Sequence, residues 1–171
     1  QGCEGDVIIA DFDVPDIVAA LLDCPIPVVA VGSSYEDESL YPEKIPYIAT
    51  DNRRIVQLAF EHLVETGLPN FAMYSMPASM RNRWAQEREL AFQHLTQRDG
   101  LQCDIYRGQT ARAQDWNDGL QHLIEWLQSR PKPIGIIAVT DARARHLMQA
   151  CLIAGIAVPE EIAIVGIDND S

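Results

Sequence analysis

Short apolar runs alternate along the chain with longer segments in which apolar residues recur every three or four positions. A short apolar run rich in β-branched residues predicts a buried strand, and the three-to-four spacing predicts a helix with one apolar face. Strands are predicted at residues 7–10, 28–31, 47–49, 71–74, 104–106, 136–139 and 162–165. Helices are predicted from residues 15, 51, 83, 116 and 141 onward. Strands that alternate with helices predict an α/β fold with doubly wound parallel sheets and helices on both faces.

Turns and helix ends are marked by proline, glycine and small polar residues. The stretch 35–46 is acidic, contains two prolines and lacks apolar periodicity, which predicts an exposed loop and the one candidate boundary between lobes. Gly67 and Gly155 follow the apolar stripes of two helices and are placed to end them. Asp141 is expected to cap the helix that Gly155 ends.

Acidic residues outnumber basic ones by 25 to 13, which gives a formal net charge of −12. Phosphate binding needs clustered Lys and Arg, so nucleic acid is not expected as a direct partner of this chain. The four cysteines are scattered without metal-ligand or redox spacing, so no metal or cofactor is expected. No apolar run approaches the roughly 18 residues of a membrane span, so no membrane partner is expected. The chain lacks an initiator Met and stops after a strand end, so we expect a fragment of a longer protein.

Polar or acidic residues follow five of the predicted strands. They are Asp11, Thr50 with Asp51, Ser75, Thr140 with Asp141, and Asp168. The ligand of an open α/β sheet sits outside the carboxyl ends of its strands. These residues therefore predict a crevice with hydrogen-bonding groups, which is typical of a ligand-binding domain.

Asp11 and Asp13 form a D-x-D pattern after an apolar strand, as the nucleophile and acid of a haloacid-dehalogenase-type phosphotransferase do. Val14 and Pro15 follow here, where that family has a Thr or Ser that helps to bind phosphate. The alternative, which we favour, is a strand-end Asp and a second Asp that caps the next helix. The four histidines lie in or near predicted helices without triad partners, so we expect a protein that is not an enzyme.

A more specific pattern joins two segments near the end of the chain. Val139-Thr140-Asp141-Ala142-Arg143-Ala144 is followed about two dozen residues later by Val165-Gly166-Ile167-Asp168-Asn169. These segments resemble the effector-binding domain of the lactose/galactose repressor family, which shares the periplasmic sugar-binding-protein fold. Other elements agree in order, namely Ile8-Ile9-Ala10-Asp11, Pro27-Val28-Val29 before Gly32, Asp51-Asn52 ahead of His62-Leu63 and Gly67, and Arg88-x-x-Ala91-Phe92. The resemblance covers nearly the whole chain and implies a type I periplasmic-binding-protein fold, with residues 1–49 as a partial first lobe and 50–171 as most of the second.

Sugar sites combine carboxylates with an Arg and an aromatic face, because each hydroxyl both donates and accepts hydrogen bonds. The resemblance places Arg88 and Asp168 on sugar-contacting positions of the family. It aligns Asp11 with a polar position of the first lobe and Thr140 with a position usually occupied by Asn. Trp84 lies four residues before Arg88 on the same helix face, where its ring could stack on a sugar. These five residues are the predicted ligand-binding residues.

Each predicted contact also has a purely structural interpretation. Arg88 could be a surface residue paired with Glu87 or Glu89, and Trp84 could belong to the core. Asp168 could cap the turn after the last strand. The ordered match to the family favours ligand contact for Arg88 and Asp168.

The resemblance further implies a sugar sensor inside a transcription regulator of carbohydrate metabolism. Residues 47–52, 83–89 and 135–145 are most similar to a pentose-responsive activator of the family, which implies D-xylose as the effector. DNA binding would then belong to a domain outside this chain, in a cytoplasmic protein. A homodimer is expected because an incomplete sheet leaves apolar strand edges open for pairing. A transport-linked periplasmic sugar-binding protein is the alternative from another class.

Overall fold

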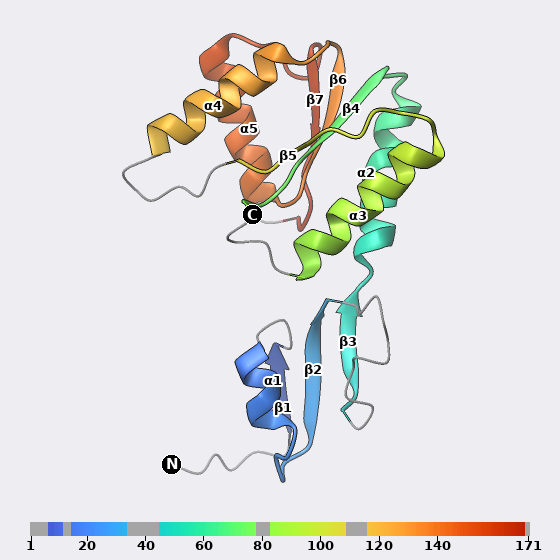
Figure 1. Cartoon of the computed structure of the whole chain (residues 1–171), viewed down its shortest axis with the longest axis vertical. Helices are drawn as coiled ribbons and strands as arrows, with labels where there is room; N and C mark the ends of the chain where they lie inside the picture. The colour runs from blue at the N-terminus through green and yellow to red at the C-terminus, as the bar shows by residue number, and fades with distance from the viewer. Residues whose placement is uncertain (1–6, 12–14, 34–44, 78–82, 109–115, 170–171) are drawn as a thin grey trace. The chain divides into compact units, whose positions relative to one another are not determined.

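The computed structural model describes residues 7–11, 15–33, 45–77, 83–108 and 116–169 (Figure 1). The chain forms two compact units, one made of residues 1–52 with 82–84 and the other of 53–81 with 85–171. Each unit has its own parallel sheet and apolar core, which confirms the predicted α/β class. Asp13 and most of the predicted loop at 35–46 lie outside the described residues.

The first unit is a three-stranded sheet with one described helix. Its strands are β1 (Ile8–Asp11), β2 (Val28–Ser33) and β3 (Tyr47–Thr50), and the helix is α1 (Pro15–Leu21). The strands are parallel in the order β1-β2-β3. Exposure alternates along β1 and β3, so the described residues pack on one face of this sheet. The core on that face contains Val28, Ala30 and Ile45 with Ile8, Ala10, Leu21, Cys24 and Tyr47.

The second unit is a four-stranded parallel sheet with helices on both faces. Its strands are β4 (Asn70–Tyr74), β5 (Ile105–Tyr106), β6 (Ile134–Ala138) and β7 (Ile162–Val165), in the order β5-β4-β6-β7. Helices α2 (Asn52–Glu65) and α3 (Arg83–Arg98) contribute to the core on one face, and α4 (Trp116–Ser129) and α5 (Asp141–Ala154) to the core on the other (Figure 1). Every residue of β6 is buried.

Side chains of β4 alternate between these two cores. Phe71 and Met73 belong to the core on the α2–α3 face, and Ala72 and Tyr74 to the core on the α4–α5 face. The alternation follows from the two-residue period of a strand. It decides which helices each residue at the end of β4 faces.

The two ends of α5 show how local sequence shapes the turns of this sheet. Thr140 is the N-cap, because its backbone is extended and its hydroxyl accepts a hydrogen bond from the Arg143 amide at 3.2 Å. The expectation that Asp141 is the cap is therefore wrong. Asp141 already lies in the first helical turn, and its amide donates to the carbonyl oxygen of Ile167 at 2.8 Å. Gly155 ends the helix as predicted, with a left-handed φ of 68°.

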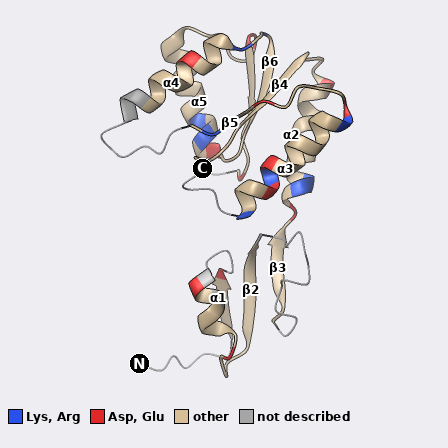
Figure 2. Cartoon of the chain, in the orientation of Figure 1, with Lys and Arg blue, Asp and Glu red and all other residues tan. Residues whose placement is uncertain are grey.

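The described side chains include both free thiols and charged pairs. Cys24, Cys103 and Cys151 are free. Within the described ranges, no group of three or more His, Cys, Asp or Glu side chains could hold a metal ion. None of the helices that the structure describes is long and apolar enough to cross a membrane. Helices α2, α3 and α5 each carry both acidic and basic residues (Figure 2). Arg98, the last residue of α3, is paired with Asp99, the residue that follows it.

Candidate functional site

The strands of the second unit are parallel, so their last residues meet along one edge of the sheet, which we call the carboxyl edge. In strand order, this edge carries Arg107 after β5, Ser75 after β4, Thr140 shortly after β6 and Asp168 shortly after β7. Open α/β sheets bind their ligands at this edge. The polar side chains predicted from strand ends are therefore grouped where a ligand would be held.

Arg88 on α3 reaches the carboxyl edge and joins two strand ends. Its Nη1 donates to the carbonyl oxygen of Val139 at 2.6 Å, and Nη1 and Nη2 both donate to Oδ1 of Asp168 at 3.2 Å. Arg88 is buried, whereas the Asp168 side chain is 42% exposed. A guanidinium is rarely buried unless its charge is paired, and here it is. Arg88 is therefore not a surface residue, and it contacts the other residue that the resemblance favoured.

Asp168 is held in an unusual backbone conformation. Its φ is 113° and that of Asn169 is 55°, both in a region that residues other than glycine rarely adopt. Such conformations cost roughly 1–3 kcal/mol each and cluster at binding and switch sites. Oδ2 of Asp168 has no hydrogen-bond partner among the described residues, and the side chain is partly exposed, so this oxygen can accept a hydrogen bond from a ligand.

Thr140 presents its hydroxyl beside the Arg88 contact. Its Oγ1 is used as an acceptor by the helix cap, which leaves the hydroxyl hydrogen to be donated. The start of α5 lies close to the end of β7. A Cβ at Gly166 would collide with the Asp141 carboxylate. The second unit thus brings together Arg88, Thr140 and Asp168 at one edge.

The other two predicted residues group with the first unit. Asp11 is the last residue of β1 and is exposed. Trp84 is the second residue of α3, is half-buried and belongs to the first unit. The spacing of four residues places Trp84 and Arg88 on one side of the helix. Ligand contact by Asp11 and Trp84 stays a prediction.

Sequence reasoning missed a second ion pair at the carboxyl edge. Nε of Arg107 donates to both carboxylate oxygens of Glu89 at 3.1 Å, and Nη2 donates to Oε2 at 2.7 Å. The hydrogen bond to Glu89 raises the pKa of Arg107, which keeps the guanidinium charged. A signal was present, because Ala85, Arg88, Glu89 and Phe92 recur at the spacing of a buried helix face. Charged residues at core-facing positions are paired, and the partner of Glu89 is distant in sequence.

On the α4–α5 face of the same edge, Tyr74 is the centre of a polar and aromatic cluster. Nη1 of Arg143 donates to the Tyr74 hydroxyl at 2.6 Å, and the guanidinium lies over the ring, 4.9 Å from its centroid. The Tyr74 hydroxyl and Nδ1 of His146 are 2.8 Å apart. Burial raises the pKa of Tyr74 and lowers that of His146. These contacts fasten the first turns of α5 to the end of β4.

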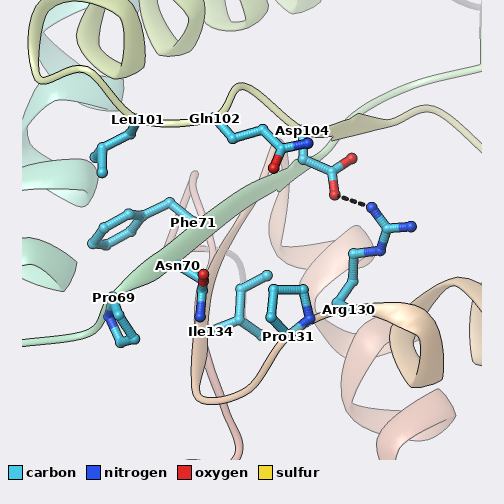
Figure 3. Close-up of a pocket in the computed structure, with 9 residues that line it drawn as sticks. All are labelled: Pro69, Asn70, Phe71, Leu101, Gln102, Asp104, Arg130, Pro131 and Ile134. Atoms are coloured by element: carbon cyan, nitrogen blue, oxygen red, sulfur yellow. Dashed lines mark hydrogen bonds and ion pairs between the residues drawn. The ribbon is translucent and has the colours of Figure 1, made fainter.

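A small pocket of about 70 Å³ lies at the opposite, amino edge of the sheet (Figure 3). It is bordered by Asn70 at the start of β4 and Ile134 at the start of β6. Within its wall, Nη1 of Arg130 donates to Oδ2 of Asp104 at 2.6 Å. Ligands of open α/β sheets bind at the other edge, so this pocket is not the candidate site. The Asp104–Arg130 pair serves as a counterpart to the two pairs of the carboxyl edge.

An α/β unit that gathers a paired Arg, an exposed carboxylate and a hydroxyl at the carboxyl edge of a parallel sheet has the form of a ligand-binding domain. The family described as periplasmic binding protein-like domain matches residues 60–171. A second family model, described as XylR N-terminal domain, matches residues 1–53. The chain belongs to the periplasmic binding protein-like family.

Two curated relatives are xylose operon regulatory proteins. The one from Haemophilus influenzae is 49% identical over 165 residues, which are 96% of this chain and 42% of that protein. The one from Escherichia coli K12 is 46% identical over 166 residues, which are 97% of this chain and 42% of that protein. The chain therefore spans less than half the length of these relatives.

Solved structures agree with this relationship. A structure of a xylose-binding transcription activator matches with a TM-score of 0.89 and 47% identity, over 97% of this chain and 43% of that one. A periplasmic binding protein/LacI transcriptional regulator from Alkaliphilus metalliredigens, complexed with D-xylulofuranose, matches with a TM-score of 0.68 and 22% identity, over 96% of this chain and 57% of that one. The second likeness shows the fold alone. Together they confirm the predicted periplasmic-binding-protein-like fold.

Proposed function

We propose that this chain is the effector-binding part of a transcription regulator and that its effector is D-xylose. The observation that carries the proposal is the contact of Arg88 with Asp168 at the carboxyl edge. The xylose operon regulatory proteins at 46–49% identity support a sugar effector and a regulatory role, and they do not favour a transport protein or a phosphotransferase. We infer a sensor without enzymatic activity.

The chemistry of the edge suits an uncharged sugar. Asp168 offers an oxygen that accepts a hydroxyl hydrogen, Thr140 offers a hydrogen to a hydroxyl oxygen, and Arg88 has donors in a rigid fork. The guanidinium and the carboxylate neutralise each other, so a neutral ligand leaves no charge uncompensated. We include Asp11 as a polar contact and Trp84 as a stacking surface in the same proposal.

The remaining parts of the proposal concern the whole protein. We assign residues 1–49 to a first lobe and 50–171 to a second. DNA binding belongs to a domain outside this chain, which fits the net charge of −12. We propose a cytoplasmic homodimer. Sugar binding would change the population of the form that binds DNA.

Titration calorimetry of the intact protein with D-xylose tests the function. The wild-type protein should bind, and Asp168→Ala should weaken binding by about one to two orders of magnitude, because a hydrogen bond to a charged group contributes roughly 1.5–3 kcal/mol. The matched control is Asp104→Ala, which removes the acid of the Arg130 pair at the amino edge and should leave xylose affinity unchanged. Unchanged affinity in Asp168→Ala would remove Asp168 from the site, and no binding by the wild-type protein would refute the effector.

A further inference from the structure

Helix α3 carries two neighbouring charged residues that are both buried. Arg88 and Glu89 are 6% and 3% exposed. Each is paired with a residue on a different strand end, Arg88 with Asp168 after β7 and Glu89 with Arg107 after β5. These strands are the two edges of the four-stranded sheet. A single turn of α3 therefore forms ion pairs with residues that follow both outer strands of the sheet.

The geometry of the Glu89–Arg107 pair leaves part of the guanidinium free. The carboxylate uses Nε and Nη2, which lie along one side of the guanidinium. Nη1 points away from that side and has no hydrogen-bond partner among the described residues, and the Arg107 side chain is 37% exposed. An Arg held through one side by a buried carboxylate is a rigid donor on its other side.

Ser75 lies between the two ion pairs in strand order. Ser75 is fully buried, and its Oγ has no hydrogen-bond partner within the described part of the chain. Strand alternation places it with Met73 on the α2–α3 face, and Ile105 likewise places Arg107 on that face. A buried hydroxyl without a partner is costly, and such groups usually have a reason to be retained. Three polar groups therefore lie along the carboxyl edge on the face of the sheet that α3 covers. They are Arg107, Ser75 and the Arg88–Asp168 pair.

We propose that Arg107 is a further specificity-determining residue of the effector site, which donates from Nη1 to one hydroxyl of the sugar, and that Glu89 is the residue that positions it. This inference rests on the proposed sugar effector and deepens it. The two ion pairs are each neutral, so the edge selects an uncharged polyol over a phosphorylated or acidic sugar. Ser75 follows the neighbouring strand, and its buried hydroxyl lies on the same face of the sheet as Arg107.

Titration calorimetry of the intact protein with D-xylose and with deoxy analogues that each lack one hydroxyl tests the assignment. Arg107→Gln should weaken D-xylose binding by about ten- to a hundredfold. One analogue, the one without the hydroxyl that Arg107 contacts, should bind the wild-type protein and the variant equally. Glu89→Gln should reduce the discrimination against that same analogue, because it frees the guanidinium from its carboxylate.

Arg130→Gln is the matched control. It breaks the ion pair with Asp104 at the amino edge of the same sheet (Figure 3). Asp104 directly precedes β5, and Arg107 directly follows it. It should leave the affinity for every analogue unchanged. Equal weakening of all analogues by Arg107→Gln, or no weakening of any, would overturn the assignment while wild-type binding of xylose still supported the proposed function. Absence of wild-type binding would overturn both.

Discussion

The two sheets of this protein are built from similar strands, but they are buried to different degrees. In the second unit, helices lie on both faces and all of β6 is buried. In the first unit, the described residues cover one face, and Ile9 and Ile48 on the other face are 70% and 69% exposed. The apolar run 7–10 and the run 136–139 look alike as sequence. Their burial depends on a second layer of helices, which only one of the two sheets has among the described residues.

This difference shows that an apolar sequence in a parallel strand indicates which faces need to be buried, but not whether helices are present to bury them. Parallel strands are apolar on both faces because helices normally pack on both. Large apolar side chains left in water forgo roughly 1.5–3 kcal/mol each relative to full burial. In the second unit, its own helices bury both faces of the sheet. We therefore expect substitutions to have unequal effects in the two units.

The largest effect should come from the same substitution made in both sheets. Ile136→Ala removes buried methyl groups from the core on the α4–α5 face and should lower the free energy of unfolding by about 2–5 kcal/mol. Ile48→Ala, at an exposed position, should change it by less than about 0.5 kcal/mol. Urea unfolding followed by hydrogen-exchange mass spectrometry separates the peptides of each unit. Similar losses in the two variants would mean that Ile48 is covered in solution and would remove the contrast between the sheets.

A smaller effect is expected where a strand end continues into a helix. Thr140→Ala removes the hydroxyl that caps α5 and should destabilise the second unit by about 1 kcal/mol. Thr50→Ala, at the end of β3 in the first unit, changes an exposed residue of the same type and is the control. Thermal unfolding of the two variants beside the wild-type protein measures the difference. If Thr50→Ala is the more harmful change, the cap is not what Thr140 contributes.

The smallest effect is a pH dependence confined to the second unit. All four histidines, His62, His94, His122 and His146, lie in its residue ranges. Burial lowers the pKa of His146 below its ordinary 6.5, and Arg143 adds to this effect. The unfolded chain therefore binds a proton at higher pH than the folded protein, so stability is lost as pH falls below about 6.5 towards the lowered folded pKa. Hydrogen exchange at about pH 7.5 and about pH 5.5 should show this loss in the second unit, and His146→Gln should reduce it. An equal loss in the variant would assign the pH dependence to other groups.

Local patterns predicted the elements of this fold better than the contacts between them. The strand predicted at 104–106 is present as β5, which has two residues. The helix at 141–154 has the predicted bounds, but sequence placed the cap on Asp141 because Asp and Thr are both good caps and stand side by side. Arg88 and Asp168 were found because a family resemblance supplied long-range order. Arg107 was missed because its partner, Glu89, is 18 positions away and no local pattern joins them.

The order of residues 87–89 also limits how the length of α3 can change. Arg88 faces Asp168 and Glu89 faces Arg107, so the positive and the negative residue of α3 are adjacent in sequence. If Leu90 were deleted while the core beyond it kept its place, every residue before it would move one position along the helix. Arg88 would then face Arg107, and Glu87 would face Asp168. Both attractive pairs would become repulsive ones, although no charge had been removed. Deletion of Leu90 would therefore destroy both ion pairs although it removes no charged residue. A conservative substitution at Leu90 would keep both pairs.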